Sequence, residues 1–238
     1  MQAAKALDAP LVGGPLGSAH LFGMGFDRAF DLDRPIDPAD EVSSGIRERF
    51  RLFAKAAGIS SLDDCKGRLV VSLGLAAARF YNSVDWRRSS FGNLNRHAHL
   101  SLGVLEAIVR TLQAPTMEFL THCVKNDLVF AAVAGPSPQK RHPAVIALGA
   151  APVIRLVDLY EKPVRDLLDR HGIPIVSLRS SEGGGLLAEH FWGNDAAHGN
   201  LEYGKEVVRA IARLRDTARS GTEATATQPP AAPSAQPK

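Results

Sequence analysis

A continuous apolar run, Leu128-Val129-Phe130-Ala131-Ala132-Val133-Ala134, ends at the turn sequence Gly135-Pro136-Ser137-Pro138. Its length and its β-branched and aromatic residues favour a strand over a helix, and the glycine and prolines mark where that strand stops. A strand without alternating polar residues is covered on both faces, which is typical of a parallel sheet. The run therefore predicts a buried parallel strand with a shaped loop at its carboxyl end.

On either side of this run, short apolar segments alternate with amphipathic ones. Strands are expected at 10–14, 68–74 and 173–176, and helices at 42–57, 100–112, 117–124 and 153–170. Pro115 separates the second and third of these helices, whereas Pro163 lies within the last. The alternation predicts an α/β fold: a three-layer α/β/α sandwich with a parallel sheet. Ligands of such folds bind at the carboxyl ends of the strands.

Length and composition fit one folded domain followed by a tail. The chain has 238 residues, of which 45% are hydrophobic and 22% are charged, so it can bury a sizeable core. From about residue 217 onward, Thr, Ala, Pro, Gln and Ser dominate and no aromatic residue occurs. Such a segment cannot bury enough apolar surface to fold. We therefore expect an α/β domain over residues 1–216 and a disordered tail over residues 217–238.

Charge and cysteine content argue against several classes of partner. The net charge of +3 is small for this length and the basic residues are dispersed, so nucleic acid is not expected. Cys65 and Cys123 are the only cysteines and have no zinc-type spacing, so a disulfide scaffold and a metal site are not indicated, and no cofactor is expected. No stretch has the length and apolarity of a signal peptide or a membrane span, which predicts a cytoplasmic protein without a membrane partner.

The stretch most typical of a functional site lies near the carboxyl end: Phe191-Trp192-Gly193-Asn194-Asp195-Ala196-Ala197-His198-Gly199-Asn200. An amphipathic helix follows it, and Asn200 stands where the N-cap of that helix belongs. An aspartate three residues before a histidine suits acid–base chemistry, because the carboxylate fixes the ring tautomer while the other ring nitrogen exchanges a proton. The alternative is that Asp195 and His198 make only local capping hydrogen bonds in a surface loop.

This stretch, continued through Leu201-Glu202-Tyr203-Gly204, resembles the last conserved block of the SGNH (GDSL-like) hydrolase superfamily. In that block an Asp-x-x-His before the C-terminal helix supplies the acid and the base of a Ser-His-Asp triad. The resemblance is clearest over residues 128–215, weaker over 68–127 and poorest at the N-terminus. It implies a flavodoxin-like fold, with Asp195 as the acid and His198 as the base.

The resemblance also implies where the nucleophile and the oxyanion-stabilising groups belong. In the family a serine follows the first strand in a Gly-Asp-Ser sequence, but strict alignment on the strand end places Pro15 there. A shift of three residues makes Ser18 the expected nucleophile. The family's Gly-x-Asn falls on residues 74–76, which lack the asparagine. Gly74 and Asn82 are therefore the candidates for oxyanion or substrate binding.

Two hypotheses about function remain open. In the first, the chain is an esterase or carbohydrate deacetylase that cleaves a small-molecule or carbohydrate ester through Ser18, His198 and Asp195. In the second, it is a catalytically inactive SGNH-like domain that binds a ligand or a protein partner, as the irregular serine and asparagine positions indicate. A nucleotide-binding α/β protein is a weaker third interpretation, because the glycines at 13–17 lack the G-x-G-x-x-G spacing.

Ser137 is a second serine that follows a predicted strand. Its Gly-x-Ser-Pro context is superficially similar to a nucleophile elbow. It lacks the second glycine that lets such a strained turn pack, and prolines flank the serine on both sides. Ser137 is therefore expected to shape the loop beside the site and not to act as the nucleophile.

Overall fold

The computed structural model describes residues 2–8, 48, 51–82, 86, 100–179 and 184–226. The expected strand at 10–14 and the candidate nucleophile Ser18 lie outside the described residues. The elements are, in chain order, α1 (Gln2–Ala6), the 3-10 helix η2 (Asp63–Cys65), β1 (Leu69–Val71), α4 (Ala78–Tyr81), α5 (Leu102–Lys125), β2 (Val129–Val133), α6 (Pro143–Leu148), α7 (Ala150–Arg170), β3 (Ile175–Val176), the 3-10 helix η4 (Glu189–Phe191) and α8 (Leu201–Ala226). Residues 51–57 are helical as well.

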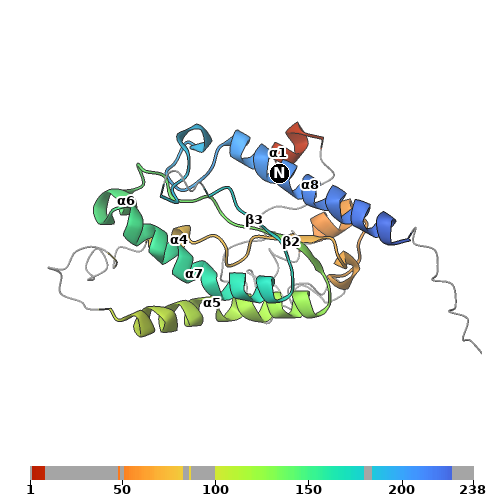
Figure 1. Ribbon diagram of the computed structural model, residues 1–238, viewed down its shortest axis with the longest axis horizontal. Coiled ribbons are helices and arrows are strands. Elements are labelled where there is room, and N and C mark those ends of the chain that lie inside the picture. Colours follow the sequence, from red (N-terminus) through yellow and green to blue (C-terminus); the bar gives the residue numbers. More distant parts are fainter. Residues whose placement is uncertain are drawn as a thin grey trace, which may run out of the picture.

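The strands β1, β2 and β3 form one parallel sheet in that order. Helices α4 and α5 connect β1 to β2, and α6 and α7 connect β2 to β3, so strands and helices alternate along the chain. In Figure 1, α5 and α7 lie next to each other below the strands, and α8, with α1 against it, lies above them. The prediction of an α/β fold with a parallel sheet is confirmed.

Two large apolar clusters join the sheet to α4, α5, α6 and α7, and a smaller third cluster packs α1 against α8. In the middle strand, Ala131 and Ala132 are fully buried, which confirms that both faces of β2 are covered. The first cluster joins the sheet to α5 and α7, and the second joins α4 and α6 to α5 and α7. Each large apolar side chain buried in this way stabilises the fold by about 1.5–3 kcal/mol. Fully buried members of the two clusters include Leu75, Leu105, Leu120, Val153, Leu156, Val164 and Leu168.

Helix α5 corrects the expectation of two helices separated by Pro115. The structure has one helix over Leu102–Lys125, with Pro115 inside it. A proline inside a helix costs about 3 kcal/mol, because it removes a backbone N–H and crowds the preceding turn. Buried residues on both sides of it, such as Val109 and Phe119, anchor the helix in the two apolar clusters. Tertiary packing therefore offsets the local cost of the proline.

Gly74 lies just after β1 and contacts α5 and α7. Its φ of +70° is one that side chains rarely adopt, and a Cβ there would lie 2.5 Å from Val164 Cγ2. Gln113, fully buried on α5, donates from Nε2 to the carbonyl oxygens of Gly74 and Tyr160, both at 3.0 Å. This packing fixes the direction in which the chain leaves β1.

We expect Gly74→Ala to lower the free energy of unfolding more than Gly67→Ala does. Gly67 has a similar backbone conformation (φ +62°), but nothing lies within 4 Å of where its Cβ would be. Both substitutions carry a backbone strain of about 1–2 kcal/mol. Only Gly74→Ala adds steric overlap, which costs about 1–3 kcal/mol more. Urea unfolding of the two variants measures the difference, and equal losses of stability would show that the packing around Gly74 is not tight.

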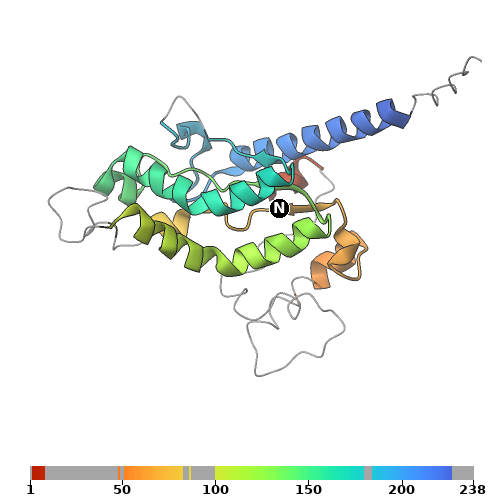
Figure 2. The same ribbon diagram turned by 60° about the horizontal axis from the view of Figure 1, so that its bottom comes forward.

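Helix α8 extends past the expected domain boundary. It runs from Leu201 to Ala226, whereas the sequence predicts a tail from residue 217 onward. Its first half carries the buried residues Tyr203 and Ile211, and its far end points away from the sheet (Figure 2). Residues 217–226 hold three alanines, one arginine and one glutamate, which favour a helix, beside five Thr, Ser and Gly residues, which do not, so helix propensity alone does not explain the extension. The disorder expected further along falls on residues 227–238, which lie outside the described residues.

None of the helices that the structure describes is both long enough and apolar enough to cross a membrane. The cytoplasmic location expected from the sequence stays a prediction.

Candidate functional site

The Asp195–His198 pair lies in a tight loop between η4 and α8. Trp192 and Gly199 form an antiparallel bridge that closes the loop. Inside the loop, the Gly193 N–H donates to the His198 carbonyl oxygen at 3.0 Å. A Cβ at Gly193 would lie 2.6 Å from that oxygen, so the loop closes this tightly only because residue 193 is a glycine.

Asp195 and His198 are joined directly through their side chains. His198 Nδ1 lies 2.7 Å from Asp195 Oδ2, and Asp195 Oδ1 accepts from the backbone N–H groups of Ala197 and His198, each at 2.8 Å. These hydrogen bonds lower the pKa of the Asp195 carboxyl, with the Ala197 N–H as the largest cause. The carboxylate favours the ring tautomer with its proton on Nδ1, which leaves Nε2 free to accept a proton. The His198 and Asp195 side chains are 77% and 60% exposed, so a substrate can reach them.

The Asp195 carboxyl should stay ionised at pH values where an ordinary aspartate is already protonated. Because its pKa is lowered, its stabilising hydrogen bonds are intact at neutral pH and are lost only as the pH falls through that lowered pKa. His198→Ala removes one cause and keeps the Ala197 N–H, so the Asp195 pKa should rise only part of the way. Carboxyl carbon shifts followed by NMR against pH measure both midpoints. A parent midpoint at or above that of an ordinary aspartate contradicts the expectation.

The start of α8 is attached to the carboxyl end of β2. Asn200 Oδ1 accepts from the Tyr203 N–H at 3.0 Å, which confirms the expected N-cap, and the Asn200 amide donates to the His190 carbonyl oxygen at 2.7 Å. Tyr203 is buried, and its hydroxyl donates to the Ala134 carbonyl oxygen at 3.3 Å. Ala134 directly follows β2, so the loop that carries the Asp–His pair lies at the carboxyl edge of the sheet.

Gln139 holds the same loop from the segment that follows β2. Its side chain is fully buried, and Nε2 donates to the carbonyl oxygen of Asp195 at 2.8 Å and to that of His198 at 2.9 Å. Its Oε1 accepts a hydrogen bond from Arg141 Nε at 2.7 Å. One buried amide therefore binds the first and the last residue of the Asp-x-x-His turn to the carboxyl end of the sheet.

Arg141 completes this attachment. Its Nη2 donates to the carbonyl oxygens of Gly193 and Asp195, and its guanidinium carbon lies 5.2 Å from the centre of the Trp192 ring. We call Gln139 and Arg141 the clamp. Sequence reasoning missed the clamp, because the residues that it binds lie 52 to 59 positions further along the chain. Its only signal was a pair of polar residues after a predicted strand, where binding groups gather in α/β folds.

No contact among the described residues brings the other candidate site residues to the pair. Gly74 packs against α5 and α7, and Asn82 is exposed at the end of α4, where its N–H donates to the Ala78 carbonyl oxygen. Ser18 lies outside the described residues. The catalytic and binding roles of these three residues stay predictions.

Tyr81, at the end of α4, is a polar group close to the pair that sequence reasoning did not single out. Its side chain is buried, and its ring meets the His142 ring edge-on with centroids 5.0 Å apart. Its hydroxyl has no hydrogen-bond partner among the described residues. Burial, and to a lesser extent the charge of Asp195, raise the pKa of Tyr81 to about 12. The hydroxyl is therefore a protonated donor within electrostatic reach of Asp195.

The chain matches no known family model, no characterised protein and no solved structure. Within the described part of the chain, no three His, Cys, Asp or Glu side chains are grouped as a metal ion would require. The function is therefore argued from the geometry of the Asp195–His198 pair and the clamp that holds it.

Proposed function

We propose that this chain is an SGNH-like serine hydrolase that cleaves a carboxylic ester of a small molecule or a carbohydrate, as an esterase or a deacetylase. The observation that carries the proposal is the 2.7 Å hydrogen bond between His198 Nδ1 and Asp195 Oδ2, in a loop attached to the carboxyl end of β2. A hydrogen-bonded Asp–His pair at this edge of a parallel sheet is suited to be the acid and base of a catalytic triad.

In the proposed reaction the Ser18 hydroxyl is the nucleophile. His198 Nε2 accepts its proton as Ser18 Oγ attacks the ester carbonyl carbon, and Asp195 stabilises the resulting imidazolium. The alcohol leaves with the proton from His198, and an acyl-enzyme remains on Ser18. Water then attacks the acyl group while His198 takes one of its protons, and the carboxylic acid leaves as Ser18 regains its hydrogen. The scheme uses no metal and no cofactor.

The proposal extends to a three-layer, flavodoxin-like sandwich. In the flavodoxin-like order the first strand lies beside the third, which is followed by the fourth and fifth. Strands β1, β2 and β3 are parallel and adjacent in sequence order, as the third, fourth and fifth strands of that fold are. In this proposal the strand that the sequence predicts at 10–14 is the first strand of the fold. The helices above and below the strands in Figure 1 support this assignment.

Hydrolysis of short-chain p-nitrophenyl esters and of acetylated oligosaccharides by the full chain tests the proposal. We expect turnover that a fluorophosphonate, which reacts with catalytic serines, abolishes in step with its covalent incorporation. Ser18→Ala is the matched control and should neither hydrolyse the esters nor take up the reagent. If the parent neither hydrolyses an ester of the panel nor reacts with the reagent, the non-catalytic binding domain becomes the better interpretation.

A further inference from the structure

Arg141 is exposed, yet its guanidinium group is held in one place. Nε donates to Gln139 Oε1 at 2.7 Å, and Nη2 donates to the carbonyl oxygens of Gly193 and Asp195. The planar group also lies against the Trp192 ring, with 5.2 Å between the guanidinium carbon and the ring centre. Its position relative to the Asp–His loop is therefore fixed, because every one of these partners belongs to the loop or to the clamp.

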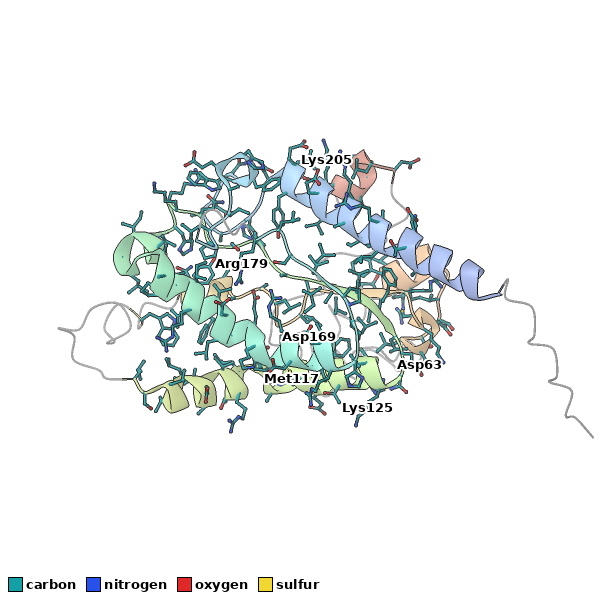
Figure 3. All side chains as sticks on the ribbon, in the orientation of Figure 1. Asp63, Met117, Lys125, Asp169, Arg179 and Lys205 are labelled. Carbon is teal, nitrogen blue, oxygen red and sulfur yellow. The ribbon has the colours of Figure 1, made fainter. Side chains whose placement is uncertain are left out.

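The positive charge of Arg141 is not neutralised by any carboxylate in the described part of the chain. Its hydrogen-bond acceptors among the described residues are all neutral amide or carbonyl oxygens. Arg179, labelled in Figure 3, differs in this respect, because it lies 3.3 Å from the buried carboxylate of Glu161. The Asp195 carboxylate uses both of its oxygens within its own loop. The fixed cation therefore retains its charge for an anion from solution.

The Nη1 end of Arg141 carries two N–H donors that the clamp does not use. None of the described residues accepts a hydrogen bond from Nη1, whereas Nε and Nη2 are both committed. His198, which is 77% exposed, stands on the loop that Arg141 binds. A small anion at Nη1 would thus be bound at the loop that carries the proposed general base.

We propose that Arg141 Nη1 binds a carboxylate, and that the ester cleaved at this site carries a carboxylate elsewhere in the molecule. The second part rests on the proposed function, and the first does not. A guanidinium group binds a carboxylate through short, charge-assisted hydrogen bonds, and a group that is already immobilised loses little entropy when it does so. If Arg141 only held the loop in place, the hydrogen bonds of its Nε and Nη2 would be explained, but no affinity for carboxylates would be expected.

Acetate is the probe for this site, and Trp192, which lies against Arg141, is the reporter. Titration of the full chain with sodium acetate at constant ionic strength should change the tryptophan fluorescence saturably. Acetamide, which has the same shape and no charge, should leave the fluorescence unchanged. The response should disappear in Trp192→Phe, since the other tryptophan, Trp86, is buried in the cluster between α4 and α7.

Three variants distinguish acetate binding by the Arg141 guanidinium group from nonspecific attraction by nearby positive charge. Arg141→Gln should weaken acetate binding about tenfold, the factor expected for a lost hydrogen bond to a charged group. Arg141→Lys keeps the positive charge but loses the planar guanidinium group, so it should weaken acetate binding by a smaller factor. It replaces Arg141→Gln in the test if that variant does not fold. Lys140→Gln removes an exposed neighbouring charge and should leave binding unchanged. An acetate response that is missing from the parent, or that survives in Arg141→Gln, overturns the carboxylate site.

A pair of esters that differ in charge tests the substrate class. We expect the parent to hydrolyse 4-acetoxybenzoate with a higher kcat/KM than the neutral 4-acetoxybenzamide, and Arg141→Gln to reduce that preference about tenfold. If Arg141→Gln disturbs the Asp–His loop, kcat/KM falls for both esters alike, and this loss cancels in the ratio of the two kcat/KM values. Equal hydrolysis of the two esters by the parent refutes the charged substrate and leaves the proposed function standing. Acetate binding without hydrolysis of either ester refutes the proposed function and leaves the carboxylate site standing.

Discussion

His198→Ala is expected to reduce ester hydrolysis by about a thousandfold or more while leaving the melting temperature close to that of the parent. The imidazole ring is 77% exposed, so its removal creates no buried cavity, and its hydrogen bond to Asp195 lies at the surface. The rate falls because the nucleophile then has no base to take its proton. Initial rates on p-nitrophenyl acetate and thermal unfolding of the same preparations measure the two quantities.

Asp195→Asn should give a comparable loss by a different route. The asparagine oxygen can still accept from the Ala197 and His198 N–H groups, so the loop closes as before. Its NH2 group donates to His198 Nδ1, however, which moves the ring proton to Nε2, the nitrogen that must accept a proton. His190→Ala removes another exposed histidine, from η4, and is the control that should change the rate little. If His198→Ala or Asp195→Asn keeps the parent rate, the pair is not the acid and base.

Gln139→Leu is expected to have the largest combined effect on stability and rate. Leucine has a similar volume, but it removes one of the two donors to each of the Asp195 and His198 carbonyl oxygens, which keep only Arg141 and the Gly193 N–H respectively, and it leaves Arg141 Nε without its acceptor. The loss of these hydrogen bonds should lower the free energy of unfolding by about 2–4 kcal/mol. The rate should fall as well, about a hundredfold, because the Asp–His pair is no longer held against the sheet and small misplacements of catalytic groups are costly.

Gln113→Leu is the matched control for this substitution. Gln113 is also fully buried, and its Nε2 also donates to two main-chain carbonyl oxygens, but it lies on α5 and makes no contact with the Asp–His loop. We therefore expect Gln113→Leu to lower the free energy of unfolding as well, but to reduce the rate of hydrolysis much less than Gln139→Leu does. Urea unfolding and kcat, measured where both variants are folded, compare the two. Equal losses of rate would mean that Gln139 acts through stability alone and does not position the pair.

The sequence predicts best those features whose partners lie nearby in the chain. The apolar run at 128–134 predicts β2, because a short β-branched segment bounded by glycine and proline has few alternatives. Asp195 and His198 are three residues apart, so a tight turn suffices to join their side chains. Asn200 caps α8 for the same reason, since its partner is the Tyr203 N–H three residues later.

Features that depend on distant partners could not be predicted in this way. Gln139 and Arg141 belong to no recognisable motif, and their importance follows only once folding brings the loop of residues 192–199 to the end of β2. Pro115 is a similar case. Proline disfavours the interior of a helix, so the sequence predicts a break there, and only the buried side chains on either side of it keep α5 continuous. In both cases burial decides the outcome, and burial depends on the whole fold.

The measurement that tests the central claim most directly is the mapping of the serine that reacts with a fluorophosphonate. The full chain and its His198→Ala variant are incubated with the reagent, digested and examined by mass spectrometry. The triad predicts one adduct, on Ser18, that is lost in His198→Ala, because only the proton transfer to His198 makes that hydroxyl reactive. An adduct on Ser137 in place of Ser18, or labelling of Ser18 that persists without His198, would contradict it.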